Sequence, residues 1–200
     1  MTRRNQTLLL SLLIGGVLFA LSVAALVGIV LFRDWGSPPQ AVERAVLRAA
    51  DFQPVVSRTL DGGLTWSGCG MDGTCTASFE VEENGFDIGS EVFPADVHAV
   101  ANGIATHPKL QAQSWVYGWT LHCTPYPELS SGAVRCSATE GDRFRGDGVT
   151  AVVGPWVVMS HIQDPKLEGL IDWVGLYAGR LEDLVSTPLG PDRAPTRGLR

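Results

Sequence analysis

The most constraining feature of this 200-residue chain is an uncharged apolar run near its start. Residues 8–32 carry no charged side chain, whereas residues 1–7 before them contain Arg3 and Arg4. Because a helix rises about 1.5 Å per residue, a run of this length can cross a hydrocarbon core of about 30 Å. We therefore expect a transmembrane helix over 8–32 with residues 1–7 in the cytoplasm. A cleaved signal peptide, with "SVAAL" as its processing site, is the open alternative.

Small residues form a stripe along this expected helix, and they suggest where a partner binds. Side chains of this size at four-residue spacing let two membrane helices approach closely. We expect the partner to be an integral membrane protein or a second copy of the helix, within the lipid bilayer. Trp35 follows the run and is typical of a membrane–water interface, and residues 33–37 form a short linker. The stripe consists of Gly16, Ala20, Ala24 and Gly28.

All four cysteines follow the apolar run, and an even number in an exported domain predicts two disulfides. The segments "TWSGC" and "WTLHC" are alike in type, as are "CTAS" and "CSAT". This similarity favours a degenerate duplication, and with it pairing inside each half. We therefore expect Cys69 to pair with Cys75 and Cys123 with Cys136, each bond tying a hairpin.

Charge excludes one class of partner. After residue 34 the chain holds 12 basic and 20 acidic residues, a balance that disfavours binding to nucleic acid. The densest acidic stretch is interpreted as a solvated strand face, with a loose divalent-cation site as the alternative. This stretch contains Glu80, Glu82, Glu83, Asp87 and Glu91.

The octet "TLDGGLTW" at residues 59–66 resembles the Asp-box, also called the BNR motif. The matching positions are Thr59, Asp61, Gly63, Thr65 and Trp66. The resemblance implies a β-hairpin whose Asp and hydroxyl side chains bond the turn, with the aromatic ring packed beneath. Sialidase-like propellers repeat the box once per blade, and each blade needs about 40 residues. Because the octet occurs once here, it predicts a structural hairpin and not a glycosidase.

Patterning along the rest of the chain predicts an α+β domain over residues 38–187, followed by a disordered tail over 188–200. Its antiparallel strands are accompanied by about three helices, and the domain has a possible degenerate two-fold repeat. The helices are expected at 38–51, 94–107 and 164–187. The strands are expected at 55–60, 64–69, 74–83, 86–93, 113–123, 133–140 and 149–160.

No catalytic, cofactor-binding or metal-ligating residue is predicted, because the sequence lacks the common nucleophile and metal motifs. His98 and His107 would face opposite sides of one helix, and nothing in the spacing brings His122 to His161. Most of the tryptophans are interpreted as core residues, and two or three of them as an alternative docking patch.

The favoured function is a non-catalytic, single-pass bacterial membrane protein whose exported domain binds other proteins. It would be an accessory or assembly subunit of a membrane complex, for example a respiratory or photosynthetic one, or an envelope factor. The expected location is the inner membrane, with the domain in the periplasm. An extracytoplasmic ligand-binding or sensory domain is the alternative, and an enzyme is less favoured.

Overall fold

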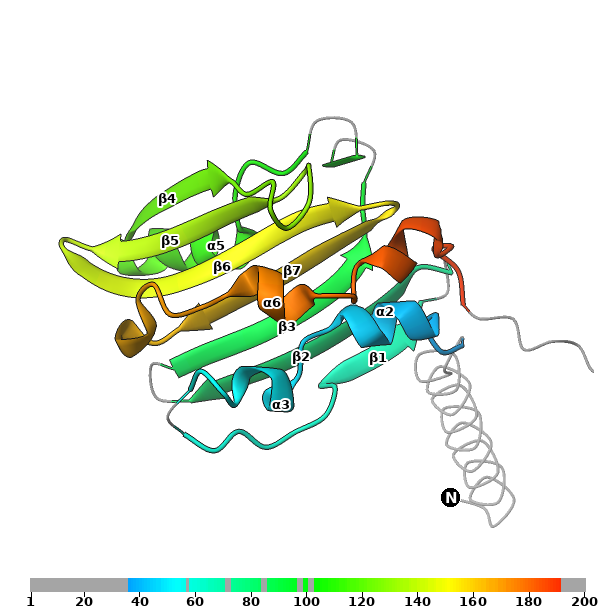
Figure 1. Ribbon diagram of the computed structural model, residues 1–200, viewed down its shortest axis with the longest axis horizontal. Helices are drawn as coiled ribbons and strands as arrows, with labels where there is room; N and C mark the ends of the chain where they lie inside the picture. The colour runs from blue at the N-terminus through cyan, green and yellow to red at the C-terminus, as the bar shows by residue number, and fades with distance from the viewer. Residues whose placement is uncertain are drawn as a thin grey trace, which may run out of the picture. The chain divides into compact units, whose positions relative to one another are not determined.

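The structure is a computed structural model that describes residues 36–56, 58–70, 73–83, 86–96, 99–100 and 103–191. Seven strands form one antiparallel sheet in the order β1-β2-β3-β7-β6-β5-β4 (Figure 1). The strands are β1 Trp66–Cys69, β2 Cys75–Glu83, β3 Phe86–Pro94, β4 Thr120–Pro125, β5 Val134–Glu140, β6 Arg143–Val153 and β7 Trp156–Gln163. The helices are α2 Gln40–Ala45, α3 Ala49–Phe52, α5 Pro108–Tyr117 and α6 Trp173–Tyr177, with 3₁₀ turns η1 Pro165–Leu167 and η2 Glu182–Ser186.

The predicted α+β architecture is wrong, because a single seven-stranded sheet with short helices takes its place. Strands from both supposed halves share that sheet, and β3 pairs directly with β7. The expected transmembrane helix over 8–32 is not shown, since that segment lies outside the described residues. Within the described ranges, no helix is long and apolar enough to cross a membrane. The stripe Gly16, Ala20, Ala24 and Gly28, together with Trp35 and residues 192–200, also lies outside the described residues.

One face of the sheet carries the main apolar core. In Figure 1, α2, α3 and α6 lie in front of the sheet and cover this face. The rings of Phe52, Phe79 and Trp173 are buried here, with Phe52 stacked on Phe79 at 6.2 Å and edge-on to Trp173 at 6.4 Å. Aromatic pairs at these distances add to the free energy gained by burying apolar area. This face therefore supplies most of the apolar burial.

A buried ion pair lies at the margin of the same core. Asp147 on β6 accepts two hydrogen bonds from Arg135 Nε and one from its Nη2, at 2.6–3.1 Å. The indole Nε1–H of Trp173 donates to the same carboxylate at 2.9 Å. Such a fork of donors compensates the desolvation of both charges.

The opposite face is covered by α5, which lies behind the sheet in Figure 1. A small apolar cluster forms beneath it from Leu110, Val134 and Cys136. Beyond this cluster, toward β3 and β2, the side chains under and beside the helix are polar or charged. This face therefore holds the buried polar groups that form the candidate site.

The position of α5 corrects two predictions, a helix at 94–107 and a strand at 113–123. Pro108 directly follows the helix predicted over 94–107, yet it begins α5, where a missing backbone N–H costs nothing. His107 caps the helix, because its Nδ1 accepts a hydrogen bond from the backbone N–H of Leu110 at 3.3 Å. Gly118 ends the helix in the left-handed conformation, which glycine adopts without steric cost. The alternation of aromatic residues at 115–121 therefore belongs to the end of a helix and the start of β4.

Two further helices are shorter than predicted, and two predicted strands differ. Residues 38–51 divide into α2 and α3, while 164–187 divides into η1, α6 and η2. Gly169 and Gly179 have positive φ, and they turn the chain where the apolar periodicity would continue a helix. Residues 53–56 and 58–60 form turns and loop in place of a strand. The strand expected over 149–160 is the hairpin of β6 and β7, turning at Gly154 and Pro155.

Both disulfides join directly opposed residues at the edges of the sheet. The structure pairs Cys69 with Cys75 and Cys123 with Cys136, as the sequence predicts. The first bond ties edge strand β1 to β2, and the second ties edge strand β4 to β5. Cys75 belongs to the main core and Cys136 to the cluster under α5, so the two bonds lie on opposite faces.

Candidate functional site

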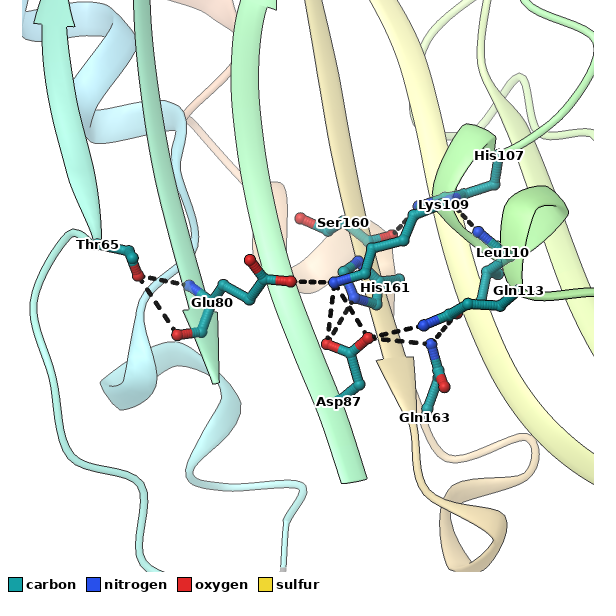
Figure 2. A network of polar contacts seen from close by, with 10 residues as sticks. All are labelled: Thr65, Glu80, Asp87, His107, Lys109, Leu110, Gln113, Ser160, His161 and Gln163. Carbon is teal, nitrogen blue, oxygen red and sulfur yellow. Dashed lines mark hydrogen bonds and ion pairs between the residues drawn. The ribbon is translucent and has the colours of Figure 1, made fainter. Parts of the chain in front are cut away.

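A buried carboxylate organises the face beneath α5. Asp87 on β3 accepts a hydrogen bond from His161 Nε2 on β7 at 3.1 Å, and its other oxygen lies 3.1 Å from the Lys109 ammonium on α5 (Figure 2). The amide groups of Gln113 and Gln163 donate to that second oxygen at 3.0 and 3.2 Å. Donors from one helix and a neighbouring strand thus converge on a single side chain.

These donors keep Asp87 ionised. Burial by itself would raise the pKa of Asp87, but the hydrogen bond and charge of His161 and the charge of Lys109 outweigh it, and the pKa falls to about 2. Burial would likewise lower the pKa of Lys109, yet its bonds to Glu80 and Asp87 raise it. The pair therefore remains an ion pair at neutral pH.

A second buried histidine holds the helix to the sheet. His107 Nε2 donates to the backbone carbonyl of Ser160 on β7 at 3.0 Å, while its Nδ1 caps α5. These two bonds define the neutral tautomer. Burial, with repulsion from His161, lowers the pKa of His107 to about 3 although the bond to Ser160 opposes the change. His107 is therefore a neutral structural side chain.

Two glycines make room for these imidazole rings. Gly89 on β3 and Gly148 on β6 are the cross-strand neighbours of His161. A Cβ atom at Gly89 would lie 2.7 Å from His161 Cε1, and one at Gly148 would lie 2.6 Å from His107 Cδ2. Real Cβ contacts are longer than this, so a side chain at either glycine would displace a ring.

His161 has a nitrogen that the surrounding groups leave unused. Its Nε2 is engaged by Asp87, whereas its Nδ1 is buried and finds no hydrogen-bond partner among the described residues. The side chain is only 4% exposed. Because Nε2 donates to Asp87, Nδ1 is an acceptor in the neutral ring and a second N–H donor in the charged ring. Either form leaves a buried polar atom unpaired, which costs on the order of 1–3 kcal/mol.

Two hollows flank this network. The first, which we call the Gly89 hollow, has a volume of about 170 Å³ and is lined by Gly89, His161, Lys109, Glu80 and Glu91, with Ser78, Phe79, Ser90 and Met159. The second, the Tyr117 hollow, has a volume of about 260 Å³. It is lined by Tyr117, Trp119, Asp87, Gln113 and Arg145, with Glu82, Phe86, Gln163 and Pro165. The paired Lys109 and Asp87 lie between them, each lining one hollow.

Large side chains are exposed at the end of α5, where Tyr117 and Trp119 also line the second hollow. Trp115 is 77% exposed, Val116 75% and Tyr117 59%, at the end of α5. The Tyr117 ring stacks on Trp119 with centroids 5.1 Å apart. We call these four residues the α5 aromatic patch. Large apolar side chains gathered at this exposure are unusual on a solvated surface and typical of interaction sites.

The carboxylate of Asp87 is already committed to its donors. The low pKa of Asp87 leaves it a poor proton acceptor near neutral pH, and its oxygens are already bonded. Within the described ranges, no three His, Cys, Asp or Glu side chains converge to hold a metal ion. Beside this network lies an open hollow lined in part by the carboxylates of Glu80 and Glu91.

The Asp-box residues lie elsewhere, and the hairpin implied by the resemblance is absent from the described residues. Asp61 is exposed in a loop, and only Trp66 belongs to a strand. Thr65 exchanges hydrogen bonds with the backbone of Glu80 on β2. Trp66 is 56% exposed, and its Nε1–H donates to Thr76 at 3.1 Å. The octet thus forms a loop that leads into edge strand β1, and its residues do not form the expected hairpin.

The structure brings together two histidines that the sequence did not place near each other. His107 and His161 pack together at 5.6 Å, whereas His122 is exposed on edge strand β4 and His98 lies outside the described residues. The acidic stretch is only partly a solvated face, because Asp87 is buried. Sequence reasoning missed the roles of Lys109 and Gln113, for which a correctly placed α5 would have been the signal.

Comparison with known proteins found no matching family model, no matching curated protein and no matching solved structure.

Proposed function

We propose that this domain is a non-catalytic binding module that docks onto another protein outside the cytoplasm, as an accessory or assembly subunit of a larger complex. The observation that carries the proposal is the α5 aromatic patch. Truncating a buried aromatic anchor at an interface typically costs about 2 kcal/mol or more, and Trp and Tyr are the residue types most enriched at such positions.

The support of the patch from below strengthens this proposal. The helix that presents Trp115 and Tyr117 is fixed at its start by His107, bonded to β7, and along its length by Gln113, bonded to Asp87 on β3. A rigid platform loses little conformational entropy when a partner binds. Exposed aromatic side chains on such a platform suit recognition better than catalysis.

The proposed location rests on the cysteines. Both disulfides close edge strands, and such bonds persist in oxidising compartments. The acidic balance of the chain after residue 34 is consistent with a protein partner and unfavourable for nucleic acid.

The test is capture of partners by cross-linking in cells, followed by mass spectrometry, with three versions of the full chain. Trp115→Ala combined with Tyr117→Ala should reduce the cross-linked partner at least about tenfold, since two anchors of the size typical for interfaces are lost. Trp66→Ala is the matched control, because it removes another exposed tryptophan at the far edge of the sheet. Equal capture by all three chains would overturn the proposal.

A second candidate function, binding of a small ligand, is favoured by the Tyr117 hollow. Its polar lining and aromatic wall are suited to a polar ligand, and its volume is about 260 Å³. Sites for small ligands usually enclose more space, from roughly 300 Å³ upward. The small volume makes this candidate second to protein binding.

A further inference from the structure

The outer edge of β4 presents backbone groups that the sheet does not use. β4 is the edge strand next to β5, at the end of the sheet opposite β1 (Figure 1). Just past its end, the Tyr126 N–H donates to the backbone carbonyl of Ala133 at 2.8 Å. Backbone groups along an antiparallel strand alternate between the neighbour on one side and the other. The even-numbered residues of β4 therefore bond to β5, and the odd-numbered residues direct their N–H and C=O groups outward.

The position of the second disulfide agrees with this assignment. Cys123 and Cys136 are directly opposed, with Cα atoms 4.0 Å apart. Such a short separation is typical of a cross-strand pair that does not exchange backbone hydrogen bonds. The N–H and C=O groups of Leu121 and Cys123 thus face away from β5, and no backbone hydrogen bond from another described segment reaches them. An edge of this kind is a template for a further strand.

The chain itself limits this template at both ends. The Trp119 N–H is already donated to the backbone carbonyl of Ser114 at 3.0 Å, where α5 ends. Pro125, at the other end, has no N–H to donate. Only Leu121 and Cys123 on β4 therefore offer both a donor and an acceptor to an incoming strand.

This short template is complementary to itself. If two copies of β4 run antiparallel with His122 at a two-fold axis, Leu121 of each copy lies opposite Cys123 of the other. Each of these pairs exchanges two hydrogen bonds, so every outward group of both residues is satisfied. Shifting one strand by two residues places Leu121 opposite Pro125, or Cys123 opposite Trp119. Those end residues lack a free N–H, so the register centred on His122 makes the most bonds.

Charge does not oppose this self-pairing. The sequence of β4 is TLHCTP, without Asp, Glu, Lys or Arg, so no fixed like charges meet when two copies pair. The other edge strand, β1, has only four residues, and the Glu43 carboxylate of α2 is bonded to Ser67 on it. Short length and nearby charge are the usual protection of an edge. Among the edges that the structure describes, β4 is therefore the one open to a second copy.

We propose that two copies of this chain associate through antiparallel pairing of their β4 strands, with the two-fold axis at His122. Their sheets then join into one continuous sheet across an interface to which both copies contribute the same surface. The inference goes beyond the proposed docking function and does not depend on it. Trp115 and Tyr117 lie on α5, outside the paired strands.

Cysteine substitutions test the register. In a glutathione redox buffer, the purified full chain with His122→Cys should form a disulfide between copies, because residues opposed in this way have Cα atoms about 4.5 Å apart. Thr120→Cys is the matched control: its two copies are four positions apart along the strand, about 13 Å, which is too far for a disulfide. Mixing Thr120→Cys chains with Thr124→Cys chains should restore the cross-link, since these positions face each other.

The cross-linked product is digested without reduction and analysed by mass spectrometry. It should contain a peptide pair joined at position 122, with the Cys69–Cys75 and Cys123–Cys136 bonds intact. Absence of that pair, or equal cross-linking by Thr120→Cys and His122→Cys, would overturn the inference. If His122→Cys in cells joins another protein and never a second copy, the edge accepts a different strand and the inference also fails.

Leu121→Pro tests the backbone hydrogen bonds in the chain that carries His122→Cys. Because the Leu121 N–H faces outward, proline removes a donor to the second copy and leaves the bonds to β5 in place. Cross-linking should fall at least about tenfold, since two symmetry-related bonds are lost. Leu121→Val is the matched control, which keeps the N–H and should cross-link normally. Equal cross-linking by the proline and valine variants would contradict strand pairing. If the proline variant does not fold, the cysteine register decides alone.

The docking function and the strand pairing can fail separately. Trp115→Ala combined with Tyr117→Ala should leave the cross-link at position 122 unchanged, because neither side chain lies on β4. If this double variant loses the captured partner while His122→Cys alone forms no cross-link between copies, the docking function stands and the paired strands do not.

Discussion

The face of the sheet beneath α2, α3 and α6 is closed, whereas the face beneath α5 is built around polar groups and is partly open. Each face buries an aspartate. On the closed face, Asp147 is enclosed by Arg135 and by the indole of Trp173. On the open face, Asp87 is held by Lys109 and His161, and hollows remain on either side of this network.

The two buried aspartates differ in how completely their surroundings are paired. A closed ion pair beside packed aromatic rings has no group left to offer a ligand, so it contributes only to the fold. The open face retains an unpaired imidazole nitrogen and unengaged carboxylates, which a well-packed core would exclude. The groups of the open face therefore stabilise the fold at Asp87 and His107 and still leave polar atoms without partners nearby.

The largest expected effect contrasts two tryptophans. Trp173 is fully buried and bonded to Asp147, so Trp173→Ala should lower the free energy of unfolding by about 3–5 kcal/mol. The Trp115 ring on the open face is 77% exposed. Its replacement by Ala should change the free energy of unfolding by only about 0.5 kcal/mol or less. Urea unfolding of both variants measures the contrast. A loss above about 2 kcal/mol in Trp115→Ala, the size typical of core truncations, would show that the patch belongs to the core.

Acid should lower the free energy of unfolding mainly through groups on the open face of the sheet. The pKa of His107 is about 3 in the folded chain, against 6.5 as its ordinary value, so the unfolded chain takes up this proton more readily. Stability is therefore complete above about pH 6.5 and falls by up to about 1.4 kcal/mol per pH unit below it, or about 3 kcal/mol by pH 4.

The control for this pH dependence is His107→Gln, which keeps a hydrogen-bond donor and an acceptor but does not titrate. Its free energy of unfolding, measured in urea at intervals from pH 7 to pH 4, should fall less steeply than that of the parent chain. Parallel curves for the two proteins would assign the acid sensitivity to other groups.

A smaller effect is expected from the ion pair itself. Asp87→Asn preserves shape but removes the charge that Lys109 and His161 contact, and it should cost about 2 kcal/mol at pH 7. Since the pKa of Asp87 is lowered from 3.8 to about 2, its contribution is present above about pH 4 and lost as the pH falls through the folded-state value. The stability difference between variant and parent should therefore shrink toward pH 2. A constant difference would mean that packing, not charge, determines the loss.

The strands were easier to predict than the helices. Alternation identified β2, because Cys75, Ala77 and Phe79 face the core while their neighbours are more exposed. The cysteine pairing was predicted from the similarity between the two halves of the sequence, and in the structure each pair is directly opposed on adjacent strands. The helix boundaries were predicted wrongly for a physical reason. A proline such as Pro108 can follow a helix or begin one, and a glycine within 164–187 can lie inside a helix or end it. Only tertiary packing decides between these outcomes.

The candidate site was harder to predict than the fold. Asp87 and His161 are 74 residues apart in the chain, and Lys109 approaches Asp87 only because α5 crosses back over the sheet. No local spacing of residues in the sequence predicts that these three side chains come together. Histidine and glutamine alternating with apolar residues at the end of β7 were the available signal, since both are buried there.

The disulfide-tied edges have a consequence for how the chain assembles. Each bond closes a short hairpin, because the paired cysteines are separated by only 6 and 13 positions in the sequence. Contacts at such short range form with little loss of chain entropy. The seam between β3 and β7 instead joins residues such as Asp87 and Gln163, 76 positions apart. Long-range pairings of this kind form late. We expect pulse-labelled amides of β2 and β5 to gain protection from exchange before those at the seam, so the face beneath α5 would be completed only when the two ends of the sheet unite.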